Sequence, residues 1–530
     1  MSYPRALQLL VIEDEHRMVE AYRTHVRVLE KDFPGITARY AATYDDAVSI
    51  LAGPQIFHVV VLDLGLPESR GGDAEEGQVR GLALVRTLAQ RDEFPVPALV
   101  IVTGRLNHVA NLEGLGTQLR EQFHYGATLN KAADNLDAGL RAACEKACEY
   151  VDVGVHVREN GDEPRPTLSP REDDLLRRYV LTRREQIGLD LRWWSATRPR
   201  SGALAEWTKV FFGRVLLRDG YERSCSRFFK LEPRASADVS ALAAKRSAQK
   251  LRHVSVVGSI GSHSRGLLVT DNAVLSDREP MPLRDLLSRE PRAASEVDQL
   301  AADVAQQLEG LSDLRQEDRA VASLLATPNG INREADLRRA AEALRVSDQV
   351  NTLIAFYVRL ARVQARRPVR AQTYHHGDLH IDNVAIDIDP GQGARAYVID
   401  AGGPSPAIYG RDLATLEVSL VLHQRCDGAQ SLVECCRDLF DGRDVAEASV
   451  PPGLPEQYLS TRALVRALRR EALSRCDGAA YAVQLLDVAL LQLAGLSYTL
   501  SQNKIANPAD ALVLCEVLAT WVEQAVSVPA

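Results

Sequence analysis

The stretch from His376 to Asn383 reads His-Gly-Asp-Leu-His-Ile-Asp-Asn, and Val-Ile-Asp-Ala-Gly follows at 398–402. In-line phosphoryl transfer depends on positioning and charge neutralisation more than on covalent chemistry. Asp378 is the candidate to orient an acceptor hydroxyl. Asn383 stands five residues later and Asp400 ends an apolar strand pattern, so both suit the role of metal ligand. The pattern therefore predicts a site of phosphoryl transfer.

The segments around this loop follow a two-lobed order. Strand patterns dominate between residues 190 and 275, interrupted by one helical pattern at 235–250, and the chain beyond 290 is mostly helical. Lys230 lies on an early strand, where a lysine would contact the phosphates of ATP. A small β-rich lobe followed by a large helical lobe predicts a kinase-like fold.

The loop string with its downstream I-D-x-G resembles the aminoglycoside phosphotransferase-like kinases, relatives of choline kinase, over residues 190–430. The resemblance implies a bilobal α+β fold, with an N-lobe at 190–285 and a largely helical C-lobe at 286–530. It also implies an ATP-dependent phosphotransferase that uses Mg²⁺ and acts on a hydroxyl of an unidentified small molecule or protein. Residues 411–417 resemble the helix after the metal aspartate in this family, in a role that is either packing or catalysis.

The nucleotide-binding part of the pattern leaves two interpretations open. The expected phosphate loop, with Ser201 and Gly202 as candidate nucleotide-binding residues, has one glycine where the family is glycine-rich. The helix after Lys230 offers Asp238 as a partner in place of a glutamate, and Glu232 shares a strand face with Lys230. We therefore expect either an active kinase or a non-catalytic nucleotide-binding module.

The loop histidines His375, His376 and His380 have a simpler interpretation as a metal cluster or as scattered surface residues. Imidazole is a common metal ligand. A histidine cluster, however, leaves Asn383 and Asp400 unexplained, so we prefer the phosphoryl-transfer interpretation.

Residues 1–150 alternate short aliphatic runs with amphipathic stretches. The aliphatic runs cover 7–12, 59–62 and 98–102, and the helical patterns cover 15–24, 43–52, 79–91, 106–121 and 133–149. Continuous aliphatic strands separated by helices predict a parallel sheet with helices on both faces. Chemistry gathers beyond the carboxyl ends of such strands.

Acidic side chains follow two of these strands, Glu13 and Asp14 after the first and Asp63 after the second. Three converging carboxylates need a cation, and Mg²⁺ prefers such oxygen ligands. One carboxylate can then act as a nucleophile toward phosphorus. Thr103 and Lys131 are placed to neutralise the oxygens of a new phosphoryl group.

This set resembles the receiver domain of bacterial response regulators. The match rests on the pair Glu13-Asp14, on Asp63 within Asp-Leu-Gly-Leu-Pro, on Thr103 within Val-Thr-Gly and on Lys131. It implies an α/β flavodoxin-like fold with a five-stranded parallel sheet. It also implies that a sensor histidine kinase or a phosphotransfer protein phosphorylates Asp63, with Mg²⁺ held by the acidic pocket.

Residues 151–189 are expected to form a linker and a connecting helix. The segment 151–170 is polar and rich in glycine and proline, which suits a domain junction. The run Ser169-Pro170-Arg171-Glu172 has a helix-capping pattern. It only faintly resembles the start of a DNA-binding helix-turn-helix, whose recognition helix does not follow.

The whole chain has 530 residues, 8 cysteines and a net charge of −8 at pH 7. Its length suggests about three domains, and its acidity argues against a nucleic-acid binder. The cysteines lack C-x-x-C spacing, as expected of reduced thiols. Because we find neither a signal peptide nor an apolar run of about 20 residues, we expect a cytoplasmic protein outside the membrane.

Together these patterns predict a two-component response regulator whose phosphorylation on Asp63 controls an attached ATP-dependent kinase. The alternative is a non-catalytic effector, in which the receiver controls the binding of a nucleotide or a partner to the kinase-like module. A DNA-binding regulator is disfavoured because no basic reading element is visible in the sequence.

Overall fold

The structure of the chain is a computed structural model, and its parts fall into two compact units. The first comprises Met1–Ala196, Trp207–Asp238 and Val257–Thr270, and the second Thr197–Glu206, Val239–Val256 and Asp271–Ala530. The residues that the structure describes are 6–68, 77–91, 93–104, 116–117, 119, 121–131, 135–158, 167–183, 186–197, 208–217, 226–250, 254–272, 280–288, 291–311, 314–319, 333–363, 367–372, 375–389, 393–399, 407–424, 431–442, 450, 456–496 and 507–526.

A parallel sheet of five strands opens the first unit, as predicted. Its strands are β1 (Gln8–Ile12), β2 (Thr37–Ala41), β3 (Val59–Leu62), β4 (Ala98–Thr103) and β5 (Gly126–Asn130). Their order is β2-β1-β3-β4-β5, and every neighbouring pair is parallel. This is the doubly wound order of flavodoxin-like folds, in which the carboxyl ends of the strands share one edge.

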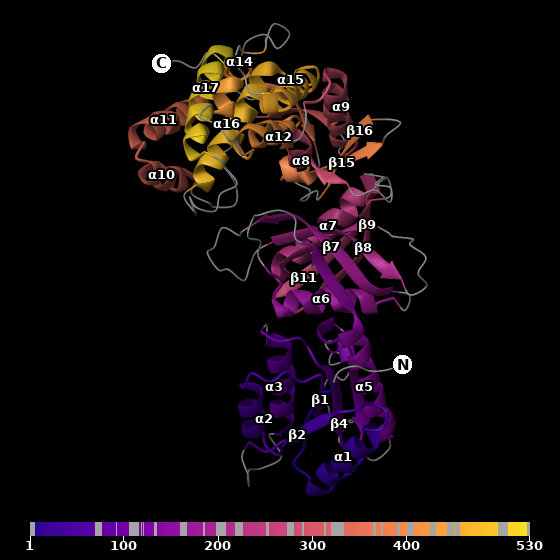
Figure 1. Ribbon diagram of the computed structural model, residues 1–530. Helices are drawn as coiled ribbons and strands as arrows, with labels where there is room; N and C mark the ends of the chain where they lie inside the picture. The colour runs from indigo at the N-terminus through magenta and orange to yellow at the C-terminus, as the bar shows by residue number, and fades with distance from the viewer. Residues whose placement is uncertain are drawn as a thin grey trace. The chain divides into compact units, whose positions relative to one another are not determined.

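Helices cover both faces of this sheet (Figure 1). One face packs against α2 (Tyr44–Leu51) and α3 (Gly77–Gln90), and the other against α1 (His16–Leu29) and α5 (Leu136–Asp152). The central strands β3 and β4 are buried along their whole length because both faces are covered. The helix expected at 106–121 falls largely outside the described residues.

A six-stranded sheet follows in the order β10-β11-β9-β8-β7-β6. It contains β6 (Gly154–Arg158), β7 (Gln186–Thr197), β8 (Thr208–Leu217), β9 (Ser226–Pro233), β10 (Val254–Gly261) and β11 (Arg265–Asn272), with α7 (Arg234–Lys250) after β9. The strands predicted between residues 190 and 275 and the helix at 235–250 are present. In contrast, the polar junction expected from 151 contains β6, which pairs in parallel with β7.

The connecting helix α6 (Pro170–Leu181) lies between β6 and β7 in the sequence and has the predicted cap. The Ser169 side chain accepts from the Glu172 N–H, and the Glu172 carboxylate accepts from the Ser169 N–H. Leu175 and Leu176 are buried in the core of the six-stranded sheet. The structure therefore confirms the capped helix.

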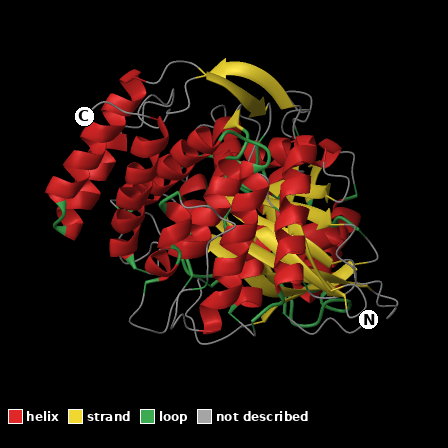
Figure 2. Cartoon of the chain, turned by 90° about the horizontal axis from the view of Figure 1, so that it is seen from above, coloured by secondary structure: helices red, strands yellow, loops and turns green. Residues whose placement is uncertain are grey.

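The second unit is mostly helical, as predicted (Figures 1 and 2). Its helices are α8 (Leu283–Leu287), α9 (Ala294–Leu311), α10 (Arg333–Leu344), α11 (Ser347–Val363), α12 (Arg411–Leu422), α13 (Leu432–Cys435), α14 (Arg437–Phe440), α15 (Leu459–Leu473), α16 (Gly478–Gly495) and α17 (Pro508–Val526), with 3-10 turns η4 (Ile381–Asn383) and η5 (Glu456–Tyr458). Two small sheets complete it: β12 (Met281–Pro282) with β15 (Val384–Asp389) and β16 (Gly393–Val398), and β13 (Leu314–Arg319) with β14 (Arg367–Gln372) and β17 (Ala407–Ile408).

One helix among the described residues, α16, is long and apolar enough to cross a membrane. Within the fold, 72% of its apolar window is buried. Its residues belong to the core of the second unit, which is typical of the central helix of a bundle.

A buried ion pair lies inside this helical core. The Arg469 guanidinium on α15 donates from Nη2 to Glu417 Oε2 on α12 at 2.7 Å, and both side chains are almost wholly buried. Tyr481 on α16 donates its hydroxyl to the same carboxylate. The guanidinium also lies 4.9 Å from the ring centre of Trp521 on α17. These contacts link four helices through one charge pair.

We predict that Arg469→Met destabilises the second unit by about 3–5 kcal/mol, because it leaves the buried Glu417 carboxylate without its cation. Urea unfolding of the full chain measures the change. Arg470→Met is the matched control, since the neighbouring Arg470 lies in an exposed pair with Asp298 whose loss costs at most about 1 kcal/mol. Equal unfolding midpoints for the two variants would contradict a structural role for the pair.

Candidate functional site

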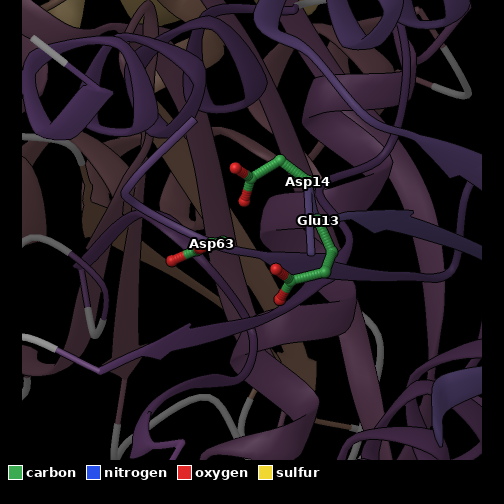
Figure 3. A group of neighbouring side chains, drawn as sticks. All are labelled: Glu13, Asp14 and Asp63. Carbon is green, nitrogen blue, oxygen red and sulfur yellow. The ribbon is translucent and has the colours of Figure 1, made fainter. Parts of the chain in front are cut away.

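Three carboxylates meet at the carboxyl edge of the five-stranded sheet. Glu13 and Asp14 follow β1, and Asp63 follows β3. Strands β1 and β3 are hydrogen-bonded neighbours in the sheet. Each residue offers one oxygen, and these oxygens all lie within 4.8 Å of one another (Figure 3). Glu13 and Asp63 are buried, whereas Asp14 is exposed to solvent. The structure thus brings together the acidic residues singled out in the sequence.

Lys131 lies between two of these acids. Its Nζ donates to Asp63 Oδ2 at 2.8 Å and to Glu13 Oε1 at 2.9 Å. A third acid, Glu15, accepts at 3.3 Å and was not expected from the sequence. Thr103 is buried at the end of β4, where its carbonyl accepts from the Lys131 N–H at 3.2 Å. The end of β5 therefore carries the cation to the acidic pocket, and Thr103 at the end of β4 is hydrogen-bonded to the backbone of the same lysine.

The pocket changes the acidity of its groups. The pKa of Glu13 is raised to about 7, chiefly by burial. The hydrogen bond from Lys131 lowers this pKa but is outweighed, and the negative charge of Asp63 raises it further. Partial desolvation inside the cluster, followed by the Asp63 charge, also raises the pKa of Asp14, whose side chain still contacts solvent. Burial alone would lower the pKa of Lys131, but its hydrogen bonds to Asp63 and Glu13 outweigh burial and raise it.

The donor set fits a hard divalent cation. Glu13 Oε2 is buried and makes no hydrogen bond with any part of the chain that the structure describes. Together with the oxygens of Asp14 and Asp63, it offers the all-oxygen, partly hydrated environment that Mg²⁺ prefers.

The loop from His376 in the second unit is held by a carboxylate of α12. Asp412 Oδ2 accepts from the His376 N–H at 2.7 Å, and Asp412 Oδ1 accepts from the Gly377 N–H at 3.0 Å. Gly377 has a φ of +82°, a conformation that side chains disfavour. The segment 411–417 thus has a packing and anchoring role, one of the two roles that its sequence left open.

The side chains of the loop are arranged around Asp378. Its carbonyl accepts from Asn383 Nδ2 at 2.7 Å and from the His380 N–H at 3.0 Å. The amide oxygen of Asn383 makes no hydrogen bond with a described residue, so it can serve as a ligand. The Ile399 N–H donates to the Asn383 carbonyl at 3.0 Å, which places the end of β16 beside the loop. Asp400, the next residue, lies outside the described residues.

Among the residues that the structure describes, the loop histidines are not gathered into a metal cluster. Within the described ranges, the only group of acids, histidines or cysteines close enough to share an ion is Glu13, Asp14 and Asp63. The His376 ring is wholly buried and lies 2.7 Å from the Ile399 carbonyl through Nε2. His376 is therefore a structural support of the loop.

Lys230 in the first unit has a different acidic neighbour from the one expected. Its Nζ lies 3.6 Å from Glu232 Oε2 on the same strand, β9. Asp238, the expected partner, pairs instead with Arg234 four residues earlier on α7, at 3.4 Å. The correction follows from helix geometry, because residues four apart on a helix face each other. Ser201 and Gly202 lie outside the described residues.

A cavity of about 500 Å³ lies in the first unit, beside α6, β10 and the start of α7. Of the site residues predicted from the sequence, Asp238 alone lines it. The cavity is thus separate from the acidic pocket at the ends of β1 and β3.

A known protein family matches part of the chain. Residues 213–416 match the model of the family described as the phosphotransferase enzyme family. No curated protein matches the chain.

Two solved structures are similar in part. The N-terminal domain of a response regulator/sensory box/GGDEF three-domain protein from Carboxydothermus hydrogenoformans is 17% identical, over 27% of this chain and 95% of that chain, with a TM-score of 0.19. A candidate aminoglycoside phosphotransferase from Ralstonia eutropha is 12% identical, over 64% of this chain and 94% of that chain, with a TM-score of 0.33.

The family match contains the loop at 376–383 and the anchoring Asp412. The flavodoxin-like sheet with its acidic pocket and Lys131 lies outside that match, in the preceding part of the chain. Residues 213–416 therefore match the phosphotransferase enzyme family, and a flavodoxin-like sheet with an acidic pocket precedes them in the chain.

Proposed function

We propose that the chain is a response regulator that receives a phosphoryl group on Asp63 and thereby controls an ATP-dependent phosphotransferase. The observation that carries the proposal is the position of Lys131 Nζ, within hydrogen-bond distance of both Asp63 and Glu13. A cation fixed beside a nucleophilic carboxylate is the arrangement that a phosphoryl group on that carboxylate needs. The phosphoryl donor would be a sensor histidine kinase or a phosphotransfer protein.

The chemistry at Asp63 follows from its neighbours. A carboxylate oxygen of Asp63 forms the new bond to phosphorus while the bond between phosphorus and the donor histidine breaks. Mg²⁺ held by Glu13, Asp14 and Asp63 would shield the repulsion between the carboxylate and the phosphoryl oxygens. Lys131 and Thr103 are the residues that would contact the phosphoryl group once it is attached.

We predict that radiolabelled acetyl phosphate with Mg²⁺ labels the full-length protein and that Asp63→Asn abolishes the label. Autoradiography after gel electrophoresis measures it. Asp45→Asn is the matched control, since Asp45 is an exposed aspartate on α2 outside the acidic pocket, and it should label like the wild type. Undiminished labelling of Asp63→Asn would place the acceptor elsewhere.

The phosphotransferase part of the proposal rests on the loop. Asp378 would orient the hydroxyl of a small molecule or protein toward the terminal phosphate of ATP. Asn383 has an available amide oxygen and, with Asp400, would hold Mg²⁺. Lys230 would contact the phosphates of the nucleotide.

A non-catalytic effector is the second candidate, and one observation favours it. Lys230 Nζ lies 3.6 Å from Glu232 Oε2 on its own strand, and the helix acid Asp238 is paired with Arg234. Kinases use a helix carboxylate to hold this lysine, whereas Asp238 on α7 pairs with Arg234. In this second proposal the module binds nucleotide without turnover.

We predict that Asp378→Asn lowers Mg²⁺-ATP turnover about a hundredfold or more while leaving Mg²⁺-ATP affinity nearly unchanged, as expected of a lost general base. Turnover is followed by phosphate release and by transfer to a panel of hydroxyl acceptors. Calorimetry gives the nucleotide affinity. Nucleotide binding without turnover in the wild type would favour the non-catalytic effector.

The helix α6 supports the regulatory part of the proposal, because its buried charges bind both sheets of the first unit. On the receiver side, Arg171 donates to the Ala89 carbonyl at 3.0 Å, and the Tyr150 hydroxyl donates to Asp174 at 2.9 Å. Arg178 donates to the carbonyls of residues 121 and 122 and, at 3.3 Å, to that of Gly261 in the six-stranded sheet. A rearrangement of the receiver would therefore be transmitted through α6 to the six-stranded sheet, which carries Lys230.

We predict that Arg178→Lys reduces the dependence of turnover on Asp63 phosphorylation, because an ammonium group cannot donate in the planar fork that spans the three carbonyls. The measured quantity is the ratio of turnover with and without acetyl phosphate. Arg183→Lys, at an exposed position just beyond α6, is the control and should keep the wild-type ratio. An unchanged ratio in Arg178→Lys would remove α6 from the regulatory path.

A further inference from the structure

Tyr22 on α1 carries a polar group into the core of the first unit. Its side chain is 1% exposed and packs in the apolar cluster between α1, α5 and the five-stranded sheet. Its hydroxyl is buried and makes no hydrogen bond with any residue that the structure describes. A buried hydroxyl without a partner is costly, and a phenylalanine would fill the same space without that cost. A functional role for the hydroxyl would explain why the core contains it.

The pocket acid Glu13 continues the face of the sheet on which Tyr22 packs. The Glu13 N–H donates to the Ala41 carbonyl of β2 at 2.9 Å, so the strand pairing of β1 continues through Glu13. Because side chains alternate between the two faces of a strand, Glu13 shares a face with Leu9 and Val11. Both of these residues belong to the cluster around Tyr22. Glu13 therefore lies at the end of the face that Tyr22 covers.

The direction of α1 turns the Tyr22 side chain toward the pocket. The helix begins at His16, shortly after Glu13, and Tyr22 lies six residues further along. At about 1.5 Å per residue, this distance is about 9 Å along the helix axis. Long side chains on a helix slant back toward its N-terminus. This slant directs the Tyr22 hydroxyl toward the end of β1, where the pocket acids lie.

The charges of the pocket also act on this hydroxyl. Burial is the largest of the causes that raise the pKa of Tyr22 above its ordinary value. The negative charge of Glu13 comes next and raises this pKa further, ahead of the opposing effect of Lys131 and the smaller effect of Asp63. Among the charged groups, Glu13 thus acts most strongly on the hydroxyl, in agreement with the directions of the strand and the helix.

Glu13 offers an acceptor that matches the donor of Tyr22. Its Oε1 already accepts from Lys131 Nζ at 2.9 Å and from the Glu15 N–H at 3.1 Å. Its Oε2 is buried and, like the Tyr22 hydroxyl, has no hydrogen-bond partner within the described ranges. A carboxylate oxygen has two lone pairs. Oε2 can therefore bind a cation with one of them and accept from a hydroxyl with the other.

We propose that Tyr22 is a positioning residue for Glu13. Its hydroxyl donates to Glu13 Oε2, directly or through one bound water, and holds the carboxylate in the orientation that a divalent cation requires. The inference deepens the phosphoryl-acceptor function proposed above and rests on it. Carboxylates that bind metals are themselves hydrogen-bonded, and the loss of such a partner typically lowers metal affinity by about 10- to 100-fold.

Tyr22→Phe tests this role, because it removes the hydroxyl and keeps the ring in the core. Mn²⁺, which takes the same oxygen ligands as Mg²⁺, is titrated into the full-length protein, and free Mn²⁺ is measured by electron paramagnetic resonance. The binding that Asp14→Asn removes belongs to the acidic pocket. Tyr40→Phe is the matched control, since Tyr40 packs against the same cluster and, after burial, the largest influence on its pKa is the charge of Arg23.

We expect Tyr22→Phe to raise the Kd for Mn²⁺ in the pocket about tenfold, and Tyr40→Phe to leave it within about twofold of the wild type. The midpoint of urea unfolding, measured with and without Mg²⁺, is the second readout. Because a bound ligand stabilises the folded state, Mg²⁺ should raise the midpoint of the wild type more than that of Tyr22→Phe. A hydroxyl with a purely structural role would change both midpoints equally.

Two results would overturn the positioning role alone: an unchanged Kd in Tyr22→Phe, or a change in its unfolding midpoint that is the same with and without Mg²⁺. Either result leaves the acceptor function of Asp63 in place. A wild-type protein that binds no more Mn²⁺ than Asp14→Asn would instead remove the cation from the acidic pocket. The proposed chemistry at Asp63 and the role of Tyr22 would then fall together.

Discussion

The burial of α12 is the constraint on which the second unit depends. Two of its carboxylates, Asp412 and Glu417, lie inside the core. A buried carboxylate is costly unless hydrogen bonds and cations satisfy it. Asp412 is satisfied by two backbone N–H groups of the loop, and Glu417 by Arg469 and a tyrosine hydroxyl. One helix therefore fixes the loop that carries Asp378 and ties it to the packing of the bundle.

The acidic pocket of the first unit solves a similar electrostatic problem with a lysine side chain. Lys131 is shared between Asp63 and Glu13, and the raised pKa of Glu13 reflects how costly the remaining charge is after burial. A phosphoryl group on Asp63 would compete for the same ammonium group. Phosphorylation would therefore redistribute the contacts that hold the end of β5, while α6 connects this domain to the next sheet.

Local patterns predicted much of the fold. The buried strands β1, β3 and β4 were visible as aliphatic runs because helices cover both of their faces. By contrast, β2 alternates exposed and partly buried residues at the sheet edge, and β6 lies in a stretch whose polar composition indicated a junction. Strand β6 exists because it pairs with β7, more than 30 residues later in the register Gly154 to Gly188, and composition does not report such a pairing.

The sequence by itself determined which candidate functional groups the chain contains. These are the acids after β1 and β3, the lysine after β5, and the spacing of Asp378 and Asn383 within one loop. These are local properties, set by residue type and by the strand or turn that each residue follows. Only the tertiary structure decided which groups meet. It paired Lys131 with Glu13 across 118 positions, Asp412 with the loop across 36, and Arg469 with Glu417 across 52. It also paired Asp238 with Arg234 and placed Lys230 beside Glu232. Ion pairs and hydrogen bonds depend on distance in space, and packing brings together residues that no periodic pattern in the sequence relates.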